Sequence, residues 1–118
     1  MAAPIVFFDI AGPDLAAQRD FYAQVFDWAS TPDGRVNAPV TAPLMGALRA
    51  DPADKVLYLG VPDVTAALDK VVRHGGSVDA PRFEVPGVVV LGLFRDPAGN
   101  RLGLVELDGD QPKIPPPR

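Results

Sequence analysis

Apolar residues along the chain fall into short segments with either strand or helix periodicity. Ile5–Ile10 is an apolar run interrupted only by Asp9 and rich in β-branched and aromatic residues, which is typical of a strand. Gly12-Pro13 ends this run, and Asp14 is placed to cap a helix whose apolar side chains recur on one stripe until Trp28. Two weaker strands, the first interrupted by a proline, are predicted over Val36–Thr41 and Leu44–Arg49.

The second half of the chain repeats this order of elements. After Pro62-Asp63, apolar residues recur at i, i+3, i+4 and i+7, which predicts a helix that ends at Gly75-Gly76. The Gly and Asn of the segment Asp96–Asn100 suit a hairpin turn between the last two strands. The strands predicted around these features are Val56–Val61, Ser77–Val85, Val88–Arg95 and Arg101–Leu107.

The two halves also match in sequence. Pro13-Asp14-Leu15 aligns with Pro62-Asp63-Val64 at a separation of 49 residues, and apolar residues of the preceding strands align at the same separation. The alternative is chance, helped by the turn chemistry that any strand–turn–helix unit shares. Because the whole order of elements repeats, we predict an α+β fold of tandem βαβββ modules. The first module spans about residues 4–50, the second about 55–108, and a proline-rich tail covers 109–118.

Composition narrows the class of protein. A chain of 118 residues with 47% hydrophobic residues is long enough for one compact domain. The net charge of −4 gives no basic surplus for phosphate binding, so we expect no nucleic-acid partner. No signal-peptide pattern and no stretch of membrane-spanning length is present, so we expect a cytoplasmic protein without a membrane partner. One His and no Cys exclude thiolate ligands and any site that takes two histidines from one chain.

Three segments in order carry a resemblance to a known family. FFDIAGPDLAAQRDFYAQVFDW resembles the opening of vicinal-oxygen-chelate proteins, the superfamily of glyoxalases, bleomycin-resistance proteins and dioxygenases. YLGVPDVTAALDKVVRHGGSV resembles the opening of their second module, and FRDPAGNRLGLVE its closing hairpin. The resemblance implies two βαβββ modules whose mixed sheet curls into an open barrel around a cleft. It also implies a homodimer.

The resemblance places four positions where the enzymes of this superfamily hold a divalent metal. These positions lie in the first and the last strand of each module. In this sequence they are occupied by Phe7 and Gly46 in the first module and by Val56 and Gly103 in the second. None of these side chains has a lone pair to donate, whereas zinc or iron needs imidazole or carboxylate ligands. We therefore expect no metal and no cofactor, and neither metal-dependent glyoxalase nor extradiol dioxygenase activity.

Strand alternation then assigns the side chains that face the cleft. The face is predicted to be apolar, with glycines making room and a few polar groups, as in many small-molecule pockets. Its ligand-binding candidates are Phe7, Asp9, Val56, Tyr58, Arg101 and Gly103. In the simpler reading Asp9 only pairs with Arg101, and Phe7 and Val56 fill the space of a lost metal. Trp28 is expected to anchor the core, and His74 to favour a helix C-terminus.

These features leave several hypotheses open. The leading one is a metal-free protein of the bleomycin-resistance type that binds a small organic molecule in the cleft. The second is a metal-independent lyase or isomerase, with Asp9 as the base and Tyr58 or Arg101 polarising a carbonyl. The third is a dimeric interaction module with a collapsed cleft. A shifted alignment, with a metal site built from Asp9, His74 or Glu106, is the last.

Overall fold

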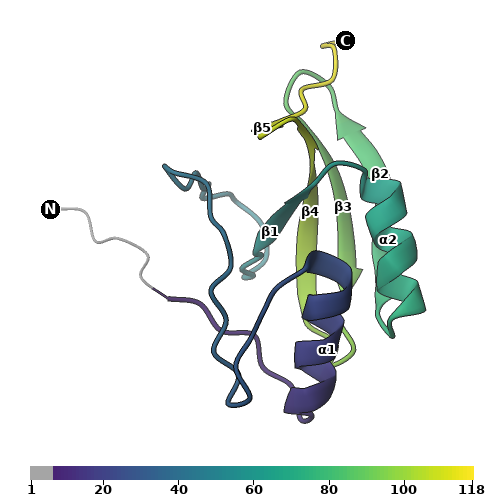
Figure 1. Cartoon of the computed structure of the whole chain (residues 1–118). Coiled ribbons are helices and arrows are strands. Elements are labelled where there is room, and N and C mark those ends of the chain that lie inside the picture. The colour runs from purple at the N-terminus through teal and green to yellow at the C-terminus, as the bar shows by residue number, and fades with distance from the viewer. Residues whose placement is uncertain (1–6) are drawn as a thin grey trace, which may run out of the picture.

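The computed structural model describes residues 7–118, which form one mixed sheet with two helices (Figure 1). The strand order is β1-β4-β3-β2, with β5 pairing to the far part of β4, and only the β1–β4 pair is parallel. The sheet is not closed into a barrel. The elements are α1 (Leu15–Phe26), β1 (Tyr58–Val61), α2 (Val64–Arg73), β2 (Ser77–Val85), β3 (Val89–Arg95), β4 (Arg101–Asp108) and β5 (Gln111–Pro112).

The second half of the chain forms a complete βαβββ module, β1-α2-β2-β3-β4. Its boundaries lie within two residues of those predicted from sequence, and β2 matches its predicted range at both ends. The predicted α+β fold with a mixed sheet is therefore confirmed. The two helices also begin in the same way, since Asp14 accepts from Ala17 N and Asp63 from Ala66 N, each at 3.0 Å. The internal repeat thus carries matching helix caps.

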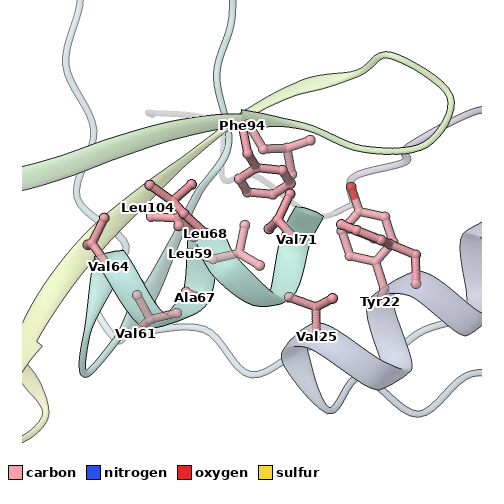
Figure 2. Packing of buried hydrophobic residues seen from close by; sticks show 12 residues of the cluster. Tyr22, Val25, Leu59, Val61, Val64, Ala67, Leu68, Val71, Phe94 and Leu104 are labelled. Carbon is pink, nitrogen blue, oxygen red and sulfur yellow. The ribbon is translucent and has the colours of Figure 1, made fainter. Parts of the chain in front are cut away.

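The hydrophobic core lies between the two helices and one face of the sheet. Figure 2 shows the side chains of Tyr22 and Val25 of α1 and of Val71 of α2 extending from their helices toward the sheet, where Phe94 of β3 lies. Val64, Val71, Phe94 and Leu104 are fully buried, as expected for side chains at the centre of such a layer. Ile10, Phe26 and Trp28 are partly buried and pack against the edge of this cluster, so Trp28 contacts the core without belonging to its centre.

The first half of the chain differs from the predicted module. It keeps its helix, but Val36–Thr41 and Leu44–Arg49 form no strands, apart from an isolated bridge between Ser30 and Val36. Of the predicted strand Ile5–Ile10, residues 5 and 6 lie outside the described residues, and residues 7–10 form no strand. Within the described residues, 37–56 take part in no backbone–backbone hydrogen bond. Prolines at 39 and 43 remove two of the donors that a strand would need. Strand propensity alone is insufficient where no neighbouring strand pairs with the segment.

The turn Asp96–Asn100 joins α1 to the β3–β4 hairpin. Asp96 Oδ1 accepts from Ala98 N and Asn100 N at 3.0 and 2.9 Å, which closes the turn. Its Oδ2 accepts from Gln18 Nε2, Tyr22 OH and Asn100 Nδ2, at 2.9, 3.0 and 2.9 Å. Burial and the neighbouring Asp96 carboxylate raise the pKa of the Tyr22 hydroxyl, so that it stays a donor. One buried carboxylate thereby fixes the position of α1 on the sheet.

None of the helices among residues 7–118 is long and apolar enough to cross a membrane.

Candidate functional site

The face of the sheet opposite the helices is apolar and open. Strand alternation sends Leu59, Val90 and Leu104 into the core and their chain neighbours to the other side. We call that side the open face. Its side chains are half-buried or exposed except at the glycine of β4, and comprise Tyr58, Gly60, Phe83, Leu91, Leu93, Gly103, Val105 and Leu107.

Tyr58 and Gly103 form the centre of the open face. They are register partners of the parallel β1–β4 pair, and the Tyr58 ring lies directly over Gly103. A β-carbon at Gly103 would overlap that ring, so only glycine allows this position of Tyr58. Tyr58 is itself 47% exposed and therefore presents an aromatic surface to solvent. Of the predicted cleft residues, these two are brought together as strand alternation indicated.

Arg101 stands at the end of the open face, where β4 begins, within a network of ion pairs. Its Nε lies 2.8 Å from Asp79 Oδ2 and its Nη1 lies 2.7 Å from Asp54 Oδ2. The hydrogen bond with Asp79 raises the pKa of the Arg101 guanidinium, and the same bond lowers the pKa of the Asp79 carboxyl. The carboxylate partners of Arg101 among the described residues are thus Asp79 and Asp54, and not Asp9.

Sequence reasoning missed these two aspartates. Asp79 lies on β2, and the pairing of β2 with β3 brings it to Arg95 and Arg101. That proximity depends on which strands pair, for which the residues of β2 carry no local signal. Asp54 belongs to the irregular segment before β1, where no periodicity marks its direction. A depression of about 290 Å³ lies beside it, lined by Arg49, Asp51, Pro52, Ala53, Asp54 and Arg101.

The remaining predicted site residues lie away from this centre. Phe7 is exposed beneath the Arg35 guanidinium, whose carbon is 5.8 Å from the ring centroid. Asp9 is exposed in the same irregular segment, and Val56 is half-buried before β1. A β-carbon at Gly46 would have no neighbour within 4 Å. The structure therefore gathers Tyr58, Gly103 and Arg101, and among residues 7–118 no hydrogen bond or ion pair joins Asp9 to any of them.

Glu106 lies on the core side of β4, opposite the open face. Its Oε1 accepts from Val64 N at the start of α2 and from Arg82 Nε, and its Oε2 accepts from Arg82 Nη2 at 2.8 Å. The Arg82 guanidinium holds the pKa of the Glu106 carboxyl at about 2. His74 ends α2, at the other end of that helix. Glu106 and His74 are structural here and do not converge with Asp9.

The donor set does not fit a metal ion. The four positions aligned with the metal ligands of the superfamily carry only aromatic, aliphatic or glycine residues: Phe7, Gly46, Val56 and Gly103. Across residues 7–118 no group of three His, Asp or Glu side chains is arranged to hold a metal. The chemistry of the open face is therefore that of an apolar surface with an aromatic centre and a charged rim.

Comparison with known proteins identifies the family of this architecture. A family model described as "Glyoxalase-like domain" matches residues 5–105. The chain is 29% identical over 111 residues to "Putative glyoxylase CFP32" of Mycobacterium tuberculosis, covering 81% of this chain and 42% of that protein. It is 27% identical over 118 residues to "Anthracycline biosynthesis protein DnrV" of Streptomyces peucetius, covering 79% of this chain and 43% of that protein. The chain thus spans less than half the length of these curated relatives.

Solved structures show the same fold. A glyoxalase-related enzyme from Fulvimarina pelagi superposes with a TM-score of 0.67 at 17% identity, over 90% of this chain and 89% of that one. A glyoxalase/bleomycin resistance protein/dioxygenase family enzyme from Burkholderia phytofirmans superposes with a TM-score of 0.55 at 16% identity, over 80% and 91% of the two chains. With the family match over most of its length, the chain belongs to the glyoxalase-like domain family of the vicinal-oxygen-chelate superfamily.

Proposed function

We propose that the protein binds a small organic molecule on the open face of its sheet, without a metal ion. The observation that carries this proposal is the exposed ring of Tyr58 over Gly103, set among half-buried apolar side chains of β3 and β4. Apolar surface with few orienting polar groups is the usual composition of a small-molecule site. The relatives named for glyoxylase activity and for anthracycline biosynthesis support a role with small organic molecules.

A neutral aromatic probe tests this proposal. N-phenyl-1-naphthylamine gains fluorescence in apolar surroundings, and we expect saturable binding with one site per chain. Tyr58→Ser removes the aromatic centre and is expected to weaken binding about tenfold, because a ring contact contributes about 0.5–1.5 kcal/mol in addition to the apolar area that it buries. Val72→Ser on α2, where the side chain is similarly exposed at 55%, is the matched control. Absence of saturable binding, or equal losses in both variants, would refute the proposal.

We also propose that the binding form is a homodimer. The segment 37–56 forms no backbone–backbone hydrogen bonds among the described residues, and it exposes four large apolar side chains: Val40, Leu44, Met45 and Leu48. Strand β1 lies at the edge of the described sheet, where one of its sides pairs with no other strand. Exposed apolar side chains beside a free strand edge favour association with another chain. A second copy of this chain offers both features at once and allows two-fold symmetry.

Sedimentation velocity measures this assembly directly. The wild-type chain is expected to sediment as a dimer, and Met45→Asp combined with Leu48→Asp as a monomer. Ile114→Asp in the tail, which is also an exposed apolar position, should leave the dimer intact. A monomeric wild type across micromolar concentrations would rule out the dimer.

Neither nucleic acid nor membrane is proposed as a partner, in keeping with the net charge of −4, and the proposed compartment is the cytoplasm.

A further inference from the structure

Two arginines face each other at the end of the open face. Arg95 at the end of β3 and Arg101 at the start of β4 are register partners in the antiparallel hairpin. Like charges directly opposite each other destabilise a strand pair unless a counter-charge lies between them. Asp79 supplies one such charge, with Oδ1 at 3.4 Å from Arg95 Nε and Oδ2 at 2.8 Å from Arg101 Nε. One carboxylate thus serves two guanidinium groups.

Asp54 supplies the second counter-charge, and it is held differently. Its carboxylate lies 2.7 Å from Arg101 Nη1 and is about as exposed as the arginine, at 39% and 31% of the side chains. Asp79 belongs to the long strand β2, whereas Asp54 lies in the segment 37–56, whose described residues form no backbone–backbone hydrogen bonds. The depression that Asp54 and Arg101 line extends from this ion pair to Arg49. Asp54 is therefore the carboxylate that can leave Arg101 without breaking the sheet.

Charge balance determines what replaces Asp54 when it leaves. Arg95 and Arg101 together carry two positive charges, and Asp79 alone compensates one of them. An incoming anion both restores neutrality and recovers the hydrogen bond at Arg101 Nη1, whereas a neutral acceptor recovers only the hydrogen bond and a cation does neither. The planar guanidinium fork also suits carboxylate, sulfonate and phosphate oxygens in particular.

We propose that Asp54 occupies the place of an acidic group of the ligand, so that the open face selects organic anions. The apolar or aromatic body of the ligand lies on the open face beside Tyr58, and its acidic group displaces Asp54 from Arg101. This inference rests on the proposed binding function and adds the ligand class and the specificity-determining residues. Asp54 then acts as an internal competitor for Arg101, which lowers the affinity for every acidic group that must displace it.

Two fluorescent probes that differ in one acidic group test the proposal. 1-Anilinonaphthalene-8-sulfonate carries a sulfonate that N-phenyl-1-naphthylamine lacks, on the same aromatic framework. The wild-type protein is expected to bind the sulfonate severalfold more tightly, because the new charge-assisted hydrogen bond contributes about 1.5 kcal/mol or more and the displaced, partly exposed Asp54–Arg101 ion pair contributes only about 0–1 kcal/mol. This preference should shrink as ionic strength rises, since the ion pair is partly exposed.

Three variants locate the effect. Arg101→Gln should weaken binding of the sulfonate severalfold more than binding of the neutral probe, and Arg101→Lys should give an intermediate loss of this preference. Asp54→Asn should strengthen sulfonate binding severalfold, because the competitor is removed. Asp51→Asn is the matched control, since Asp51 lines the same depression but pairs with Arg49 at 2.7 Å. Fluorescence of Trp28 checks that each variant is folded.

The outcomes separate this inference from the proposed function. If the neutral probe binds at the Tyr58-dependent site but the sulfonate has no advantage, the inference is wrong and the binding function stands. The inference is also wrong if Asp54→Asn behaves like Asp51→Asn, or if Arg101→Gln weakens both probes alike. If neither probe binds to the wild-type protein, both proposals are refuted together.

Discussion

Replacing Asp96 tests how the helix α1 is held on the sheet. The Asp96 carboxylate is 4% exposed and accepts five hydrogen bonds, three of them at Oδ2 and two at Oδ1. In Asp96→Ala the Gln18 amide and the Tyr22 hydroxyl lose their acceptor while still buried, at 7% and 6% exposure. Each buried donor left without an acceptor costs about 1–3 kcal/mol. The N–H group of Ala98 also loses its acceptor, but it belongs to an exposed residue and can donate to water, so it adds little to the loss. We therefore expect a loss of about 4 kcal/mol in the free energy of unfolding.

Two milder variants divide this loss into its parts. Tyr22→Phe removes one donor and leaves Asp96 with four, so we expect a loss of about 1 kcal/mol. In Asp96→Asn an amide NH2 group replaces the Oδ2 acceptor, so that donors of Gln18 and Tyr22 would face another donor. The Gln18 side chain can rotate to offer its Oε1 acceptor instead, since that atom has no hydrogen-bond partner among the described residues. The Tyr22 hydroxyl can likewise accept instead of donate. The asparagine variant should therefore lose about 2 kcal/mol, between the other two.

Urea denaturation followed by tryptophan fluorescence measures these differences. Trp28 is the single tryptophan and stacks on Tyr22, with ring centroids 5.2 Å apart, so its emission reports the packing of α1. With an m-value of about 2 kcal/mol per molar urea, Asp96→Ala should lower the midpoint by about 2 M. Asp69→Ala, at an exposed position of α2, should change it by less than about 0.3 M. If Asp96→Ala loses no more than Tyr22→Phe, the carboxylate does not organise this contact.

Three further predictions concern charge and packing in the sheet. Arg82 lowers the pKa of the Glu106 carboxyl from 4.5 to about 2, so the ionised carboxylate contributes fully to the free energy of unfolding above pH 4.5, and this contribution is lost as the pH falls toward 2. Glu106→Gln should therefore flatten this part of the curve of unfolding free energy against pH, measured by urea denaturation. Gly103→Ala should displace the Tyr58 ring and weaken binding of the neutral probe, with near-ultraviolet circular dichroism reporting the changed ring environment; an unaltered spectrum would contradict the contact. Gly92→Ala should cost about 1–3 kcal/mol in thermal unfolding, since its β-carbon would lie 2.6 Å from a buried Val64 methyl group.

Much of the fold could be predicted because its signals are local. Asp14 and Asp63 each precede an apolar helical stripe, and both cap a helix in the structure, since a carboxylate three residues before a free backbone donor is in reach of it wherever the chain goes. The boundaries of β2 and the turn Asp96–Asn100 follow in the same way from side-chain alternation and from residues that suit the turn. Alternation also placed Tyr58 and Gly103 on one face.

The first half of the chain shows where local signals are insufficient. Val36–Thr41 and Leu44–Arg49 have the apolar character of strands, but a strand exists only where a neighbour accepts and donates its backbone hydrogen bonds. The described residues of this chain provide no such neighbour. Side-chain character can therefore indicate a preference for extended backbone, but the presence of a partner strand decides whether a strand forms.

Residue identity and spacing were sufficient to predict the class of fold, the starts of both helices, the helix and strands of the second module and the lack of metal-ligand side chains at four positions. These depend on residue identity and on spacing along the chain, which are fully present before folding. Which charges meet is apparent only in the folded chain: Arg101 pairs with Asp79 and Asp54 rather than Asp9, and Glu106 pairs with Arg82 on the opposite face. Ion pairs between residues 22 to 47 positions apart depend on strand order and loop path. Those are properties of the packed chain, and no local pattern encodes them.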